Sequence, residues 1–164
     1  MTGEYEVRWD DHNENRTHVY FLHGGLHLWA AANGYIAKHE YDQSTGIDLL
    51  RQITNAMAQD QSPLYVSEAN YHMKLSRIMQ NYYLQMCYHH FCNDLGSSIP
   101  LVIYGHNLDE TRDQHLVRAI AESKTETIYY GIYDQAHELN EEAKLKRLFP
   151  SKEIFYFRSA DMFG

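Results

Sequence analysis

Short apolar runs alternate with segments of helical periodicity along most of this chain. Unbroken apolar runs of this kind are typical of strands that are buried on both faces. They occur at Val19–Leu22, Leu101–Tyr104, Thr127–Tyr133 and Ile154–Phe157, and Pro63–Val66 predicts one more short strand. Because helices alternate with these strands, the pattern predicts an α/β fold with a mainly parallel sheet that carries helices on both faces.

An Asn-Gly pair interrupts this alternation near the N-terminus. Asn33-Gly34 separates two partly apolar segments, and this pair favours the tight turn of an antiparallel hairpin. We therefore expect a β-hairpin insertion over 26–41. The chain shows no linker and no internal repeat, so we expect residues 1–164 to form a single domain.

Four helices are expected between the strands. The first is capped by Ser44 and runs to about Ala58, and the second is one long helix over 71–93. Asp109, Glu110 and Asp113 would lie in the first turn of the third, where the helix dipole favours negative charge. The fourth would begin after Asp134 and end before Pro150.

Composition excludes several classes of function. The formal charge is −8, with 14 Lys+Arg against 22 Asp+Glu, which disfavours nucleic acid as a partner. No apolar run approaches the roughly 20 residues of a membrane span, and the N-terminus lacks the pattern of a signal peptide. Cys87 and Cys92 lie five residues apart in an expected helix, which disfavours a disulfide and a metal pair. We expect reduced thiols in a cytoplasmic protein.

His23 is the first candidate site residue. It follows the expected strand 19–22 and is followed by Gly24 and Gly25, so its imidazole would lie at the carboxyl edge of the sheet. There it could act as a general base or hold a ligand hydroxyl. The alternative is a structural histidine that bonds to nearby backbone.

The second candidate is the turn Gly105-His106-Asn107 after the strand 101–104. A strand–glycine–helix turn can bring backbone N–H groups to a ribose or a phosphate. The acidic residues that follow favour a ribose or a base over a pyrophosphate. An ordinary strand-to-helix turn is the alternative.

Histidine spacing does not predict a metal site. His23 and His27 would lie about 13 Å apart on a strand, and His89 and His90 would point apart on a helix. We therefore assign no metal ligands.

Two stretches resemble known sequences. YFLHGGLHL resembles the strand–LHG element of sirtuin-like domains, and LVIYGHNLDETRDQHLVRAI resembles their later strand–Gly–acidic-helix element. LHGGLHL, PLYVSEAN and GHNL together resemble an uncharacterised bacterial family with LHGALHL, PLFVSEG and GHSL motifs. The resemblance covers about 19–133.

This resemblance implies a Rossmann-like, NAD-related fold, as in sirtuin-like NAD hydrolases, some of which serve in antiviral defence. The catalytic histidine would be His23, and Gly24, Gly105, His106 and Asn107 would contact the cofactor. The glycine-rich pyrophosphate turn of those enzymes has no counterpart before His23. The chain therefore resembles the C-terminal portion of such a fold, and a partner chain or a further N-terminal segment would complete it.

Three hypotheses follow from these observations. The first is an NAD-cleaving enzyme, and the second is a nucleotide-binding or protein-interaction module without turnover. The third is an inactive domain whose unpaired sheet edge drives formation of a homo-oligomer.

Overall fold

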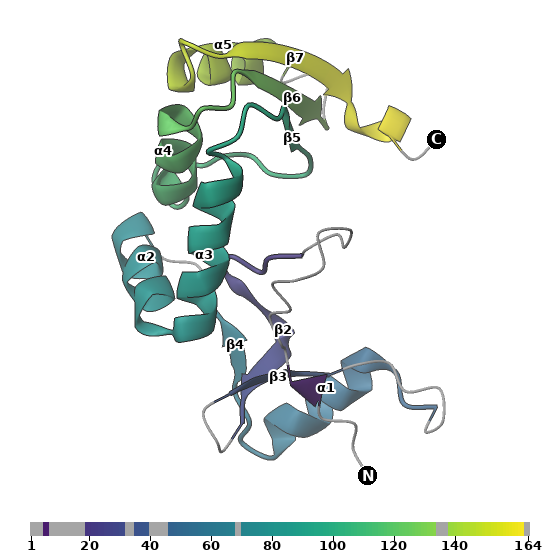
Figure 1. Ribbon diagram of the computed structural model, residues 1–164. Coiled ribbons are helices and arrows are strands. Elements are labelled where there is room, and N and C mark those ends of the chain that lie inside the picture. Colours follow the sequence, from purple (N-terminus) through teal and green to yellow (C-terminus); the bar gives the residue numbers. More distant parts are fainter. Residues whose placement is uncertain are drawn as a thin grey trace. The chain divides into compact units, whose positions relative to one another are not determined.

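The computed structural model describes residues 5–6, 19–31, 35–39, 46–67, 70–133 and 138–162 (Figure 1). The chain divides into two compact units. The N-terminal unit comprises 1–68 and 76–88, and the C-terminal unit comprises 69–75 and 89–164. The division falls within the helices α2 (Tyr71–Gln80) and α3 (Tyr82–Asp94), so each helix contributes residues to both units.

The N-terminal unit contains a four-stranded antiparallel sheet. Its order is β1 (Tyr5–Glu6), β3 (Ile36–Lys38), β2 (Gly24–Ala30) and β4 (Pro63–Tyr65). The pairing of β2 with β3 confirms the predicted hairpin, with Trp29 opposite Ala37. The Asn33-Gly34 turn itself lies outside the described residues.

The predicted strand at 19–22 is wrong, and so is the placement of His23 after a strand. Val19 is 66 % exposed, and the chain turns at Leu22 and His23, where the Gly24 N–H donates to the Phe21 carbonyl at 2.9 Å. The strand β2 begins where the expected strand ended. The apolar character of this run has another cause, because Phe21 and Leu22 pack against the core of the N-terminal unit.

Two helix predictions need correction. The helix α1 spans Leu49–Ala58 and is capped by Asp48, which accepts from the Arg51 N–H at 2.8 Å; Ser44 lies outside the described residues. The expected long helix is two helices, α2 and α3, that break at Asn81. The side chain of Asn81 accepts from the Leu84 N–H at 3.1 Å and caps α3. A capping side chain inside an otherwise periodic run therefore divided the helix.

The core of the N-terminal unit lies between this sheet and the helices. Its buried residues come from β2, β3, the residue after β4, α2 and α3: Leu28, Ile36, Val66, Ile78, Tyr83, Leu84 and Cys87. Cys87 is buried, and both cysteines are reduced thiols. Burial raises the pKa of the Cys87 thiol, so this thiol is protonated at neutral pH.

The C-terminal unit contains the predicted parallel strands. β5 (Leu101–Ile103), β6 (Thr127–Ile132) and β7 (Glu153–Arg158) form a three-stranded sheet in that order, with Ile103 opposite Tyr130 and Tyr130 opposite Tyr156. The crossovers are α4 (Gln114–Glu122) and α5 (Glu138–Leu148). A short 3-10 helix, η2 (Ser159–Met162), follows β7. Mixed α/β structure is therefore confirmed, with two separate sheets in place of the single one expected.

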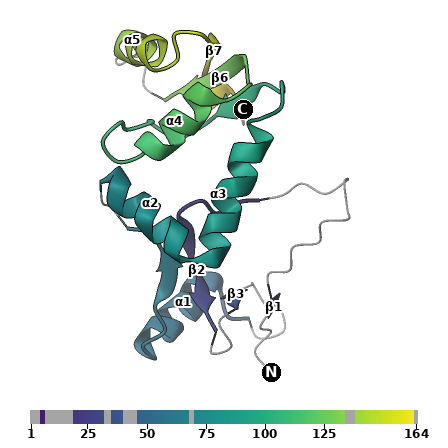
Figure 2. The same cartoon turned by 60° about the vertical axis from the view of Figure 1, so that its left-hand side comes forward.

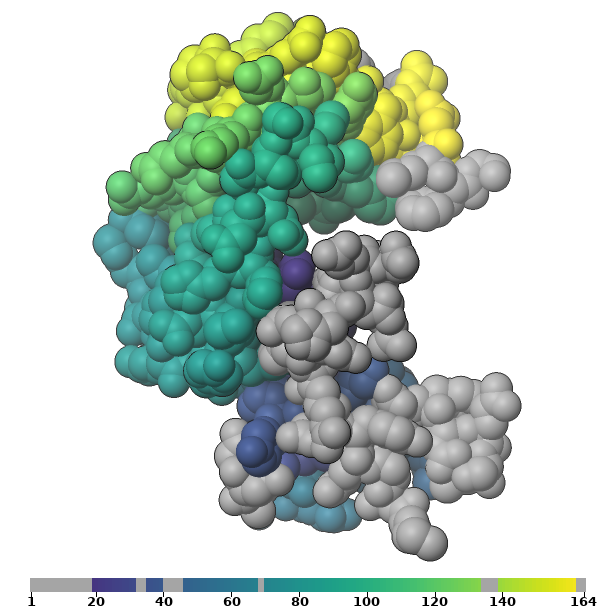
Figure 3. Space-filling view, in the orientation of Figure 1, coloured from purple at the N-terminus to yellow at the C-terminus, as the bar shows by residue number. Residues whose placement is uncertain are grey.

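Both crossover helices pack on one face of the parallel sheet. Val117 and Ile120 of α4 share a buried core with Leu145 of α5, and Ile128 and Tyr130 point into this core from β6. Figure 2 shows α4 and α5 beside the strands, and Figure 3 shows the closely packed atoms of this unit in green to yellow. Because β5, β6 and β7 are added in one direction by crossovers of one hand, their helices fall on the same face. The prediction of crossover helices on both faces is thus wrong for these three strands.

The acidic residues before α4 do not lie in its first turn. The helix begins at Gln114 with Asp113 as its N-cap residue, and Asp109 and Glu110 belong to the preceding turn. Within the described residues, no helix has the length and apolar character needed to cross a bilayer.

Candidate functional site

The turn after β5 has an unusual backbone. Gly105 and Leu108 both adopt left-handed conformations, with φ of +66° and +49°. Leu108 tolerates this because its side chain is buried in the core of the C-terminal unit, where packing offsets a cost of about 1–2 kcal/mol. The Leu108 N–H donates to Nδ1 of His106 at 3.0 Å, which closes the turn from within.

Side chains from the neighbouring strand and helix hold this turn in place. The Tyr130 hydroxyl on β6 donates to the His106 carbonyl at 2.9 Å and lies 3.1 Å from Glu141 on α5. The Lys144 ammonium donates to the Asn107 carbonyl at 2.6 Å. Burial, and then the Glu141 carboxylate, raise the pKa of Tyr130, so the phenol keeps its proton at neutral pH. The turn is thus fixed through its carbonyls.

Two groups of the turn remain open to a ligand. Gly105 is exposed, and a Cβ built on it would meet no atom within 4 Å. The Asn107 side chain is also exposed, while its carbonyl is the atom that Lys144 binds. A backbone that can be approached closely next to an exposed amide can supply both donors and acceptors.

His106 has a structural role in the turn. Because its Nδ1 accepts from Leu108, the neutral ring carries its proton on Nε2, as assigned from the hydrogen bond. Nε2 lies 3.8 Å from Oδ2 of Asp113. Both ring nitrogens therefore face protein groups, so this imidazole is not placed to act as a base toward a ligand.

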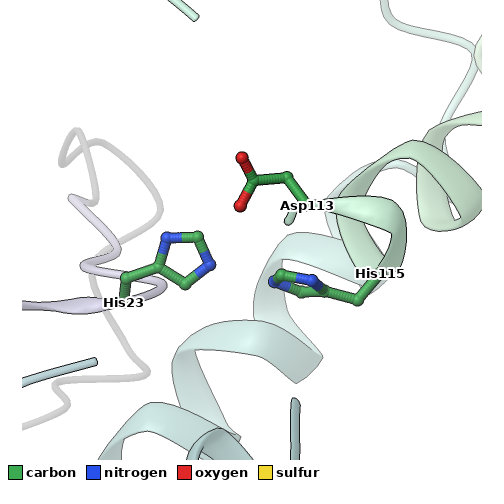
Figure 4. Close-up of side chains that lie close together, drawn as sticks. All are labelled: His23, Asp113 and His115. Atoms are coloured by element: carbon green, nitrogen blue, oxygen red, sulfur yellow. The ribbon is translucent and has the colours of Figure 1, made fainter. Parts of the chain in front are cut away.

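A buried ion pair lies at the start of α4. Asp113 makes no capping hydrogen bond with its side chain. Its Oδ1 instead accepts from the Lys74 ammonium of α2 at 2.8 Å, and both side chains are at least nine-tenths buried. Figure 4 shows Asp113 and His115 where α4 begins. The pair ties the first residues of α2 to the segment that follows the Gly105 turn, and Tyr71 N–H donates to the Thr111 carbonyl at 3.1 Å beside it.

The other carboxylates near the turn are also engaged. Oδ1 of Asp109 accepts from the Thr111 hydroxyl at 2.7 Å and from its N–H at 2.8 Å, and these bonds lower the pKa of Asp109. Glu110 pairs with Arg147, which lowers the pKa of Glu110. Because Asp109 keeps its negative charge beside the turn, the turn suits a neutral polar group better than a pyrophosphate.

The His23 turn belongs to the N-terminal unit. Its backbone carbonyl accepts from the Val66 N–H at 2.9 Å, and its side chain is partly buried. Gly24 has φ of +74°, and a Cβ there would lie 2.0 Å from the Leu64 carbonyl oxygen. A Cβ on Gly25 would lie 2.8 Å from Cε1 of the His27 ring. Strand pairing and ring packing thus account for both glycines.

The predicted site residues therefore fall into two groups. Gly105, His106 and Asn107 form one turn of the C-terminal unit, while His23 and Gly24 belong to the N-terminal unit. The catalytic and cofactor-binding roles expected of these residues stay predictions.

Sequence reasoning missed three residues that shape the Gly105 turn: Lys74, Tyr130 and Lys144. Lys74 precedes the buried Ile78 by four residues, so it lies on the apolar face of α2, which signals a buried lysine with a partner. Tyr130 and Lys144 carry no such signal, because their role depends on how β6 and α5 pack beside the turn.

Comparison with known proteins identifies the family. A family model described as Domain of unknown function (DUF4917) matches residues 1–160. No curated protein and no solved structure matches the chain. The expected membership of an uncharacterised family is confirmed, while the relation to sirtuins stays a prediction. The chain belongs to the DUF4917 family, whose function is unknown.

Proposed function

We propose that the C-terminal unit binds the ribose of a nucleotide at the Gly105–Asn107 turn, and that the nucleotide is NAD. The observation that carries the proposal is the fixed turn at the carboxyl end of β5. Its backbone is open at Gly105, and the neighbouring Asn107 is exposed.

The topology supports a nucleotide at this edge. The sequence β5–α4–β6–α5–β7, with three adjacent parallel strands, is the pattern of one half of a Rossmann-like fold. In open α/β sheets, ligands bind outside the carboxyl ends of the strands. The Gly105 turn lies at that end of β5.

The chemistry of the turn fits a ribose. A ribose diol donates and accepts hydrogen bonds, and the Asn107 amide offers one acceptor oxygen and two N–H donors. Gly105 lets a sugar approach the backbone because no side chain stands there. His106 contributes through the shape of the turn, since both its ring nitrogens face protein groups.

NAD cleavage is a separate, catalytic proposal, in which His23 of the N-terminal unit is the acid–base residue. The bond between the nicotinamide nitrogen and C1′ breaks, and its electron pair leaves with nicotinamide. Water adds to C1′, and the imidazole accepts the proton that is released. The sirtuin-like resemblance around His23 supports this role, as does its partly buried side chain in a turn.

Two assays test the proposal separately. In calorimetric titration of the full chain with ADP-ribose, we expect binding that is weakened at least tenfold by Asn107→Ala. Lys146→Ala is the control because Lys146 is an exposed residue of α5 that pairs with Glu142 and, among the described residues, has no contact with the turn. Absence of binding, or equal binding by Asn107→Ala, would remove the nucleotide site.

Turnover is measured as nicotinamide released from NAD. We expect release by the wild-type chain and none by His23→Ala, with an unchanged melting temperature. If ADP-ribose binds and no nicotinamide appears, the protein is a nucleotide-binding module without turnover. Equal release by His23→Ala would assign the chemistry to another residue.

An interaction module is the second candidate function, and one observation favours it. Large apolar side chains of the parallel sheet are exposed on one face. A homo-oligomer or a partner chain would cover them. We propose a cytoplasmic location, which is supported by two cysteines that are reduced thiols.

A further inference from the structure

One face of the parallel sheet carries an exposed apolar row. Val102, Tyr129 and Phe155 lie opposite one another on β5, β6 and β7. They are 52 %, 40 % and 44 % exposed. Their neighbours along β6, Ile128 and Tyr130, face α4 and α5 on the other side and are almost fully buried.

The topology explains why this face is open. Because α4 and α5 both connect strands that are added in one direction, right-handed crossovers place them together on the opposite face. Parallel sheets are otherwise found with both faces covered, since their strands are apolar on both sides. Tyr104 and Tyr133, which follow β5 and β6 by one residue, are exposed as well.

We propose that this face is covered by the same face of a second copy of the chain, in a two-fold symmetric dimer. The inference goes beyond the proposed nucleotide site and does not depend on it. In such an interface one surface patch meets itself, so an uncharged patch is self-complementary. The row itself contains only apolar and aromatic side chains, so like charges do not meet at its centre.

The area of the patch fits this occupant. A fully exposed aromatic side chain offers about 200 Å², so Val102, Tyr104, Tyr129, Tyr133 and Phe155 together present roughly 500 Å² at their observed exposure. A stable interface buries about 800 Å² per partner, and about two thirds of a homodimer interface is apolar. The exposed area of the patch is therefore close to the apolar area that each partner of a stable homodimer buries.

The ring geometry disfavours a stacked planar ligand. The rings of Tyr129 and Phe155 stack on each other, with centroids 5.3 Å apart and an interplanar angle of 21°. One face of each ring is therefore used within the row, so the pair offers a planar ligand fewer free faces than two separate rings would. A nucleobase needs a ring face to stack on. The net charge of −8 also disfavours a nucleic-acid strand.

Sedimentation velocity of the full chain tests the proposal. We expect the wild-type chain to sediment at about twice its monomer mass of 19.3 kDa at micromolar concentration. Phe155→Glu and Tyr129→Glu should each raise the dimer dissociation constant at least tenfold, because they place like charges against each other at the centre of the interface. Val102→Glu, at the end of the row, should raise it less.

Leu139→Glu is the matched control. Leu139 is 81 % exposed on α5, which covers the opposite face, so this variant should remain a dimer. Circular dichroism melts establish that each variant is folded. A wild-type chain that is monomeric at all concentrations, or a dimer that Leu139→Glu disrupts as much as Phe155→Glu, would overturn the proposal. Because ADP-ribose binding is measured separately at Asn107, the two proposals can fail independently.

Discussion

The turns at Gly24 and Gly105 look alike in sequence and differ in structure. Each places a glycine in a left-handed conformation, with φ of +74° at Gly24 and +66° at Gly105. A Cβ on Gly24 would lie 2.0 Å from the Leu64 carbonyl oxygen, while a Cβ on Gly105 would meet nothing within 4 Å. The first glycine is needed because another strand approaches it. The second leaves open surface.

This difference shows that a glycine beside a histidine can have either of two structural causes. At Gly24 the space is filled by β4, so the residue serves the pairing of β2 with β4. At Gly105 the space stays empty although Tyr130 and Lys144 hold the rest of the turn. A turn that is fixed and yet open suits a ligand, which is why the proposed nucleotide site rests on Gly105.

Gly24→Ala gives the largest expected effect. The new methyl group must displace the β4 backbone, and the alanine must keep a strained positive φ. We therefore expect a loss of about 4 kcal/mol in the free energy of unfolding. Urea denaturation followed by circular dichroism measures it. Gly105→Ala meets only the strain of a left-handed alanine and should lose about 1 kcal/mol. Equal losses at the two positions would contradict the contrast drawn between the turns.

Lys74→Met tests the ion pair that supports the segment after the Gly105 turn. It leaves the buried Asp113 carboxylate without its ammonium partner, and removal of one partner of a buried pair typically costs about 3 kcal/mol. Urea denaturation of the variant measures this loss. The double variant Lys74→Met with Asp113→Leu removes both charges and should recover much of the stability. If the double variant is less stable than the single one, Asp113 has a further role.

Much of the C-terminal unit could be predicted from sequence. β5, β6 and β7 were found because their apolar runs are short, unbroken and separated by helical segments. The stripe of Leu116, Val117 and Ile120 is buried on α4 as its spacing indicates. Local pattern suffices here because each strand–helix–strand unit buries its own apolar face.

The N-terminal unit shows where this reasoning fails. The run 19–22 is apolar because it packs on the core, and apolar character alone does not distinguish such a segment from a strand. The division into two sheets was also missed, since it depends on pairing between distant strands, as in β2 with β4. The site residues Tyr130 and Lys144 are set by tertiary packing and leave no trace in local spacing.

Tyr130→Phe tests whether the turn must be held to bind its ligand. The variant removes the hydroxyl that donates to the His106 carbonyl, and a lost hydrogen bond of this kind costs about 1 kcal/mol. We expect weaker ADP-ribose binding in calorimetry together with this small loss of stability. Tyr129→Phe is the matched control, because Tyr129 lies on the opposite face of the same strand. Unchanged ADP-ribose binding by Tyr130→Phe would show that the turn keeps its shape without this bond.

The smallest expected effect is a difference in how the two units respond to acid. Burial, and then the Lys38 ammonium, lower the pKa of His27; burial, and then His27, lower the pKa of His39. In the unfolded chain a histidine pKa is about 6.5. As the pH falls, the unfolded state therefore protonates His27 and His39 at a higher pH than the folded state does. The stability of the N-terminal unit is therefore complete above about pH 7 and falls as the pH drops below the unfolded value.

In the C-terminal unit Asp109 has a lowered pKa and keeps its contribution until the pH falls through that lower value, which lies below the range in which His27 and His39 take up protons. Hydrogen exchange of β2 and β3 amides should accelerate between pH 7 and 5, after correction for intrinsic rates, while that of β6 amides stays constant. His39→Gln should flatten the response of β2 and β3, because it removes one of the two protons taken up. Parallel acceleration in β6 would mean that the units do not respond to pH separately, and the contrast between them would then not extend to their acid stability.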